Sequence, residues 1–382
     1  MSNDMQQDEM REVTQYEEDG IEEIDESSTI TEPFDPNHIK IDTQPLTLHH
    51  IIDRLQHKEI NLFTEFQRGK DLWDKTQQSR LIESILLRMP LPSFYFDGQD
   101  DNKWQIVDGL QRVSTVKNFV VDKILTLENL EFLTQFNGCT YDDLHRDLQR
   151  RIAAFPIVVY LIQKGTPEEV KFNLFKRINT GGLVLTPQEI RHALNQGTPA
   201  EYVKKLAEFK EFKRATCYTI KSERMQDRDF VTRFVSFYVN YKNYQPDLDS
   251  FMNKSMAKIK SISERQRETM AEDFQKAMQI AFDIFNNDAF RKRFNLDDRR
   301  RPINKALFET LSVNFAHLSE AQKKQLLDRK DLFRQKLIKL MHKDKFIRSI
   351  SSGTGQKDAV ETRFSDVKEI IQETIGSAVN LC

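Results

Sequence analysis

Apolar residues recur at helical spacing through the second half of the chain. From about residue 200 onward few stretches alternate as strands do, and one face of a single helix carries Val231, Phe234, Val235 and Tyr238. The pattern predicts a long helix from about 319 to 343 and a last helix over 358–376, separated by a serine- and glycine-rich break at 351–355. Residues 201–382 are therefore predicted to form a mostly helical domain.

Between about 36 and 200 the pattern changes to short apolar runs mixed with helical segments. Residues 93–96 and 104–107 are apolar and aromatic, and the polar loop between them predicts a hairpin. Residues 156–162 form an almost continuous Val- and Ile-rich run that predicts another strand. A mixed α/β domain over 36–200 followed by the helical domain gives an α+β fold class.

Local capping patterns mark several helix starts. Asp74 with Gln77 forms a capping box before a helix that is expected to stop at Pro90. A Thr-Pro-x-Glu sequence puts Thr at the N-cap and Pro at the first helical position three times, at residues 166–169, 186–189 and 198–201.

The charge distribution separates a tail from the rest of the chain, although the whole chain carries a formal charge of only −2. Residues 1–35 hold 13 acidic residues and one basic residue, Arg11, whereas the remainder holds 56 basic and 46 acidic residues, a net of +10. An acidic segment poor in apolar residues is typical of disorder, so residues 1–35 are predicted to be a disordered, solubilising tail. A nucleic-acid mimic or a self-inhibitory arm against the basic body is the alternative.

Several classes of protein are excluded by what the sequence lacks. No apolar run approaches the roughly 18–20 residues of a membrane span, and the acidic N-terminus does not resemble a signal peptide. The widely spaced Cys139, Cys217 and Cys382 support neither a zinc ribbon nor a disulfide framework, so a cytoplasmic location is expected. Phosphate-loop, dinucleotide-binding, serine-hydrolase and zinc-protease motifs are absent, as is an HNH-like histidine cluster.

Three segments combine cations, amides and glycines that suit a phosphate. In the first, Asp-Gly-Leu-Gln-Arg at residues 108–112, a strand runs into a helix whose backbone N–H groups and Arg112 could meet an anion. The other two segments hold Gln67, Arg68 and Lys70, and Lys176, Arg177, Asn179, Gly181 and Gly182. A structural interpretation stays open, with Asp108 as N-cap, Gln111 as its capping partner and Arg112 in solvent.

Taken together, these segments resemble the family found as the N-terminal domain of GmrSD-type, modification-dependent restriction systems. The family's Gln-Arg loop, Pro-x-Pro turn and Asp-Gly-Gln-Gln-Arg helix start are similar to Gln67-Arg68, Pro90-Leu91-Pro92 and residues 108–112. A later family segment looks like Asn179 to Gly182 with Leu185 and Glu189. The resemblance is specific over about 60–195 and implies a ParB/sulfiredoxin-like fold for residues 36–200.

The resemblance implies that this domain binds a nucleoside triphosphate (NTP), with or without hydrolysis. Asp108, Gln111 and Arg112 are then the catalytic candidates, and Asp108 is the candidate ligand of Mg²⁺ through water. The nucleotide-binding candidates are Gln67, Arg68, Lys70, Gly109, Leu110, Arg177 and Asn179. Leu110 departs from the family's glutamine, and the chain lacks the HNH-type nuclease domain of many relatives, so DNA cleavage is not carried over.

The leading hypothesis is therefore an NTP-binding sensor or regulatory component of a bacterial DNA-restriction or anti-phage system. Its expected partners are the nucleotide, DNA, and a separate nuclease or effector. One alternative is a DNA nuclease or nickase, for which a body of +10 is a weak electrostatic footprint. The other is a non-enzymatic scaffold with a vestigial pocket that neutralises or activates a partner.

Overall fold

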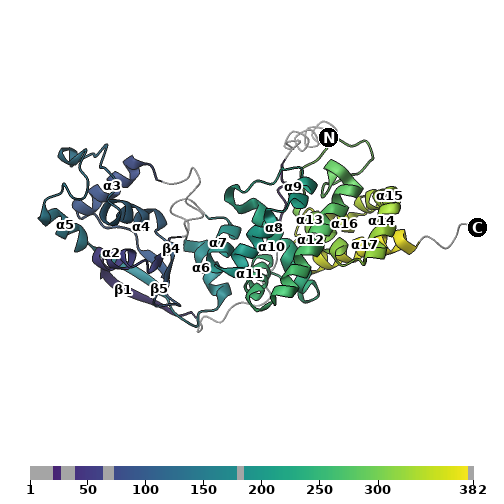
Figure 1. Cartoon of the computed structure of the whole chain (residues 1–382), viewed down its shortest axis with the longest axis horizontal. Coiled ribbons are helices and arrows are strands. Elements are labelled where there is room, and N and C mark those ends of the chain that lie inside the picture. The colour runs from purple at the N-terminus through teal and green to yellow at the C-terminus, as the bar shows by residue number, and fades with distance from the viewer. Residues whose placement is uncertain (1–19, 27–38, 63–72, 179–184, 377–382) are drawn as a thin grey trace, which may run out of the picture. The chain divides into compact units, whose positions relative to one another are not determined.

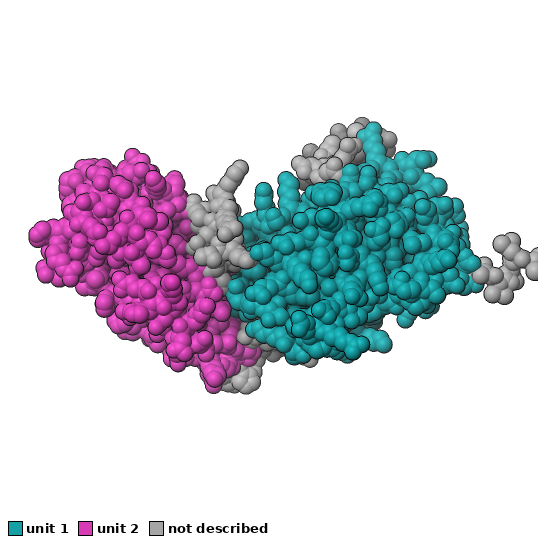
Figure 2. Space-filling view, viewed as in Figure 1, with its two compact units in different colours: residues 1–33, 186–382 teal, residues 34–185 magenta. Residues whose placement is uncertain are grey.

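The computed structural model describes residues 20–26, 39–62, 73–178 and 185–376, and the chain divides into two compact units (Figures 1 and 2). The sheet-containing unit comprises residues 34–185, and the helical unit comprises residues 1–33 with 186–382. The division comes before residue 200 because α7 (Pro187–Leu194) packs on α10 (Gln226–Asn240) and α11 (Leu248–Lys258) of the helical unit.

The sheet-containing unit is built on one mixed sheet in the order β1-β5-β3-β4-β2. Its strands are β1 (Ile41–Thr47), β2 (Ile60–Asn61), β3 (Phe94–Asp97), β4 (Trp104–Asp108) and β5 (Pro156–Ile162). The β1–β5 and β3–β4 pairs are antiparallel, whereas β3–β5 and β2–β4 are parallel. The predicted hairpin and the predicted strand at 156–162 are therefore confirmed, and the pattern did not reveal β1 and β2.

Helices cover this sheet and hold its strand ends in place. They are α2 (Leu48–Gln56), α3 (Lys75–Leu86), α4 (Leu110–Val116), α5 (Arg146–Ala153) and α6 (Glu168–Ile178), and α4 continues into a π-helical turn over Lys117–Val121. The capping box of Asp74 with Gln77 opens α3 as predicted. The buried pair of Lys171 on α6 and Asp97 at the end of β3, 2.8 Å apart, fastens α6 to the sheet.

The helical unit encloses one large apolar core rich in phenylalanine. Its remaining α-helices are α8 (Thr198–Ala207), α9 (Lys210–Ala215), α12 (Glu264–Phe285), α13 (Lys305–Ala316), α14 (Glu320–Asp328), α15 (Lys330–Met341), α16 (Asp344–Ser349) and α17 (Lys357–Gly376). A mixed sheet unit followed by a helical unit confirms the predicted α+β class, and α17 matches the predicted last helix.

Two sequence expectations about these helices are wrong. The single helix expected from about 319 to 343 is two helices, because Arg329 leaves helical geometry at φ −120° and ψ 28° between α14 and α15. Of the three Thr-Pro-x-Glu sequences, the one at Thr186 forms the expected capping box with Glu189. At the third, Gly197 takes the N-cap and Thr198 becomes the first helical residue.

The acidic tail expected to be disordered contains a segment, residues 20–26, that packs on the helical unit. Ile21 forms a parallel bridge with Ile303, and Glu22 forms an ion pair with Lys292. Both carboxylate oxygens of Glu26 accept hydrogen bonds from Arg233, at 2.6 and 2.7 Å. Residues of the helical unit therefore supply specific partners for this segment, which composition alone does not predict. The rest of residues 1–35 lies outside the described residues.

Candidate functional site

The predicted strand-to-helix junction at residues 108–112 lies at the end of β4, next to an irregularity in the sheet. Tyr95 pairs with Asp108 but Phe96 pairs with Ile106, so β4 carries an extra residue at Val107. Such bulges redirect the side chains that follow them and are frequent beside active sites. This one turns Asp108 to a half-buried position where the strand ends.

Gly109 makes the sharp turn from β4 into α4. Its φ of 97° lies in the left-handed region, which favours glycine. A Cβ atom at this position would also meet Phe94 Cδ1 at 2.8 Å, closer than real contacts allow. Gly109 is the N-cap of α4 and no side chain caps this end, so the structural interpretation of Asp108 as N-cap is wrong.

Asp108 and Arg112 form an ion pair across this turn. Arg112 Nη2 donates to Asp108 Oδ2 at 2.7 Å, and the side chains of Arg112 and Asp108 are 11% and 27% exposed, respectively. Arg112 also donates to the carbonyls of Pro92 and Ser93, and its guanidinium lies 4.6 Å from the centre of the Phe94 ring. Arg112 is thus a buried cation that ties three segments together, not the solvated side chain of the structural interpretation.

Burial dominates the electrostatics of this pair. It raises the pKa of Asp108 above its usual value, although Arg112 and the Gly109 backbone N–H act in the opposite direction. Burial likewise lowers the pKa of Arg112, against the effect of Asp108. A carboxyl group whose pKa is shifted by desolvation beside a specific charge partner, at the end of a strand, is a feature that favours a functional site.

Gln111 connects the junction to the segment that precedes α3. Its side-chain oxygen accepts a hydrogen bond from the backbone N–H of Trp73 at 3.2 Å. It is therefore not the capping partner of Asp108. Trp73 follows directly after residues 63–72, the segment that carries Gln67, Arg68 and Lys70.

Two tyrosines beside Asp108 form a pair that no local sequence pattern predicts. Tyr95 on β3 and Tyr160 on β5 are register partners, and their rings stack with centres 4.7 Å apart and planes 15° from parallel. Burial, Tyr160 and the charge of Asp108 raise the pKa of Tyr95. The two residues are 65 positions apart in the chain, so only their shared sheet register could have revealed the pair.

The other predicted site residues divide into two groups. Gln67, Arg68, Lys70 and Asn179 lie outside the described residues. Arg177 is exposed near the end of α6, and Leu110 is half-buried in the first turn of α4. Arg191, further along the chain, belongs to the helical unit, where it pairs with Asp229 and Asp249.

Asp108 fits only a limited role toward a metal ion. One of its oxygens already accepts from Arg112, a cation that opposes a second positive charge at the same atom. In the described parts of the chain no three His, Cys, Asp or Glu side chains gather as a metal site. Asp108 alone therefore offers a metal ion at most one free carboxylate oxygen.

The comparisons with known proteins agree with the motifs at this junction. No curated protein and no solved structure gives a significant match to the chain. In the parts of the chain that the structure describes, no helix has the length and apolar character needed to cross a membrane. Residues 49–196 match the family model described as GmrSD restriction endonuclease, N-terminal domain. This segment, which contains the Asp108–Arg112 junction, is therefore similar to the N-terminal domain of GmrSD restriction endonucleases.

Proposed function

We propose that the sheet-containing unit binds a nucleoside triphosphate and serves as a sensor or regulatory component of a DNA-restriction system. The observation that carries the proposal is the meeting of the Asp108–Arg112 pair and the stacked Tyr95 and Tyr160 at one end of the sheet. Aromatic faces bind nucleobases by stacking, at about 1–3 kcal/mol per base. The restriction-system family of residues 49–196 sets the biological context.

In this proposal the nucleobase stacks on the tyrosine pair and the phosphates lie toward the first turn of α4. Arg112, held by Asp108 and the Pro92 and Ser93 carbonyls, keeps that turn in shape. In the proposal Arg68 and Lys70, which precede Trp73 in the chain, supply the phosphate cations. Mg²⁺ enters with the phosphates, and Asp108 is its outer, water-bridged partner.

Trp73 gives a direct test because its backbone lies at the proposed site. The chain has two tryptophans, and the other, Trp104, is buried against Phe96. Titration with ATP, GTP, CTP or UTP plus Mg²⁺ is expected to change the tryptophan fluorescence for at least one base. Tyr95→Leu should weaken the nucleotide affinity measured by this titration at least about fivefold, since a stacking contact is worth ~1–3 kcal/mol.

Tyr218→Leu is the matched control, because Tyr218 is an exposed tyrosine of the helical unit. Circular dichroism spectra that match the wild type establish that each variant is folded. An unchanged response in Tyr95→Leu, or equal weakening in both variants, argues against the tyrosine pair as the base site. Release of inorganic phosphate under the same conditions separates a hydrolysing enzyme from a sensor that only binds.

A further inference from the structure

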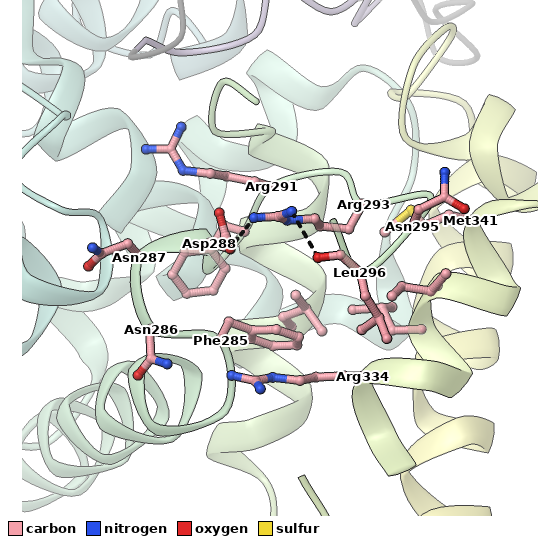
Figure 3. A pocket seen from close by; sticks show the side chains of 14 residues that line it. Phe285, Asn286, Asn287, Asp288, Arg291, Arg293, Asn295, Leu296, Arg334 and Met341 are labelled. Atoms are coloured by element: carbon pink, nitrogen blue, oxygen red, sulfur yellow. Dashed lines mark hydrogen bonds and ion pairs between the residues drawn. The ribbon is translucent and has the colours of Figure 1, made fainter. Parts of the chain in front are cut away.

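The helical unit contains a cavity of about 410 Å³ that has no role in the site described above. Ligand pockets in proteins occupy about 300–1,000 Å³, so this cavity has the size of a small-molecule site. Figure 3 shows side chains from the end of α12, the following loop and α15 around it. Leu311 of α13 completes the wall.

The cavity combines an apolar floor with a cationic and amide-bearing rim. The floor consists of Phe285, Phe290, Leu311, Leu337, Ile338 and Met341. The polar part of the lining, called the rim below, consists of Arg291, Arg293 and Arg334 with Asn286, Asn287 and Asn295, against one acidic residue, Asp288. Asp288 is already paired with Arg293, so the lining as a whole is positive and complements an anion.

The three arginines differ in how firmly they are held. Arg291 is buried and donates to the Arg301 carbonyl and to Thr219 Oγ1. Arg293 donates to Asp288 and to the carbonyls of Leu296 and Asp298, which fixes it in the wall. Arg334, 28% exposed, pairs at 3.3 Å with Asp331, which is 78% exposed. Such a solvent-exposed pair contributes little to stability. Arg334 extends from α15 toward the end of α12 in Figure 3 and can therefore exchange Asp331 for an anionic ligand.

The backbone beside the cavity is held in conformations that cost free energy. Asn286 has φ 51° and ψ −123°, a combination that favours glycine, and Phe290 has φ 64°. Non-glycine residues in such regions are strained and concentrate at ligand sites. Both residues line the cavity.

The mouth of the cavity presents an exposed apolar side chain. Leu296 lines the cavity yet is 66% exposed, so a bound ligand would cover it. Two aspartates, Asp297 and Asp298, follow it directly and precede Arg299, Arg300 and Arg301, so the mouth adds little net charge. A ligand with an apolar or planar body and an acidic group would satisfy the floor, the mouth and the rim together.

We propose that this cavity binds a nucleoside phosphate, either free or as part of a nucleic-acid strand. The ring packs on Phe285 and the apolar floor, where aromatic contact suits any base. Asparagine amides, which both donate and accept hydrogen bonds, meet the base edge. Arg334 takes the phosphate as a planar fork. This site lies within the helical unit and does not depend on the proposed NTP site.

Calorimetry on the full chain tests the proposal with each of the four deoxynucleoside monophosphates, a single-stranded oligonucleotide and inorganic phosphate. At least one nucleotide or the oligonucleotide is expected to bind, more tightly than inorganic phosphate. Binding of monophosphates identifies free nucleotides as the source, and binding of the oligonucleotide alone identifies a strand. Equally tight binding of inorganic phosphate contradicts the proposal, because the apolar floor would then contribute nothing.

Two variants assign the binding to the cavity. Arg334→Ala removes the movable cation and Ile338→Phe narrows the cavity, and each should weaken binding at least about tenfold. Lys339→Ala, an equal loss of charge at an exposed position on the same helix, should bind as the wild type does. Affinities are compared only for variants whose thermal unfolding midpoint matches that of the wild type. The absence of binding by the wild type at millimolar ligand, or unchanged affinity in both cavity variants, overturns the proposal.

Discussion

Arg112 donates a 2.7 Å hydrogen bond to Asp108, four residues earlier in the chain, across the turn from β4 into α4. The same guanidinium serves the carbonyls of Pro92 and Ser93 and covers the Phe94 ring. One buried cation therefore joins the start of β3, the end of β4 and the first turn of α4. Burial raises the pKa of its partner, Asp108, because it disfavours the charged carboxylate.

The two members of this pair should respond differently to substitution. Arg112→Met is expected to lower the free energy of unfolding by about 2–4 kcal/mol, because the Asp108 carboxylate loses its cation and two carbonyls lose a donor. Asp108→Asn should change it by less than about 1 kcal/mol at pH 7, since the neutral amide still accepts from Arg112. Urea unfolding measures both values, and equal losses would contradict the assignment.

Asp108 also predicts a pH dependence with a defined sign. Burial raises its pKa above the usual 3.8, so the native state holds this proton to a higher pH than the unfolded state does. The protonated Asp108 therefore contributes its full stabilisation below pH 3.8, and this contribution is lost as the pH rises through the native pKa. The stability of the wild type relative to Asp108→Asn should therefore fall from pH 3.8 upward, and a rise over that range would refute the shift.

Substitution of Gly109 should lower the free energy of unfolding more than substitution of another glycine in the left-handed region does. Gly109→Ala is expected to lower the free energy of unfolding by about 2–4 kcal/mol, because it adds a contact with Phe94 to the backbone strain. Gly138, at φ 86°, has no heavy atom within 4 Å of the place that a Cβ would occupy, so Gly138→Ala carries the strain alone. Thermal unfolding of the two variants should show the larger loss for Gly109, and equal losses would argue against the close contact.

For Glu83 on α3 we expect the opposite pH dependence of stability. Burial raises its pKa, but the backbone N–H groups of residues 131–133, with Arg80, outweigh that effect and hold the pKa below the usual 4.5. The stabilisation is thus present above pH 4.5 and lost as the pH falls through the native pKa.

Glu83→Gln should therefore lower the free energy of unfolding by about 1–3 kcal/mol at pH 7, and by less at pH 3. Glu131→Gln, at an exposed position, is the matched control and should have little effect. A Glu83→Gln loss that does not shrink on acidification would show that the carboxylate charge is not the cause. Urea unfolding at the two pH values provides the comparison.

Glu26 completes a buried charge network of the helical unit. Among the described residues this network joins four cations to four carboxylates: Arg191, Arg233, Lys305 and Arg363 with Asp229, Asp249, Glu309 and Glu26. Glu26→Gln is expected to lower the free energy of unfolding by about 1–3 kcal/mol, because Arg233 is buried and loses one of its partners. Glu23→Gln, at an exposed position in the same segment, should have no measurable effect in the same melt.

Local patterns predicted the elements whose signals lie within a few residues. The Asp74 capping box, the β3–β4 hairpin and β5 belong to this group. β1 escaped because it is polar and contains Pro45, and its pairing with β5 spans more than a hundred residues. The break at Arg329 escaped because no glycine or proline interrupts the helical pattern between residues 319 and 343.

The candidate site was predicted in its chain segments but not in its contacts. The motif located residues 108–112, yet burial of Arg112 and the Trp73–Gln111 hydrogen bond depend on distant segments. The Tyr95–Tyr160 stack arises from the register of β3 and β5, which no local pattern encodes.

Calorimetric titration with the four common NTPs plus Mg²⁺ tests the central claim most directly. The wild type is expected to bind at least one of them, and Arg68→Ala combined with Lys70→Ala should weaken that affinity at least about tenfold. Lys103→Ala, at an exposed position just before β4, should bind as the wild type does. The absence of binding by the wild type, or equal affinity in the wild type and the Arg68→Ala, Lys70→Ala variant, would contradict the claim.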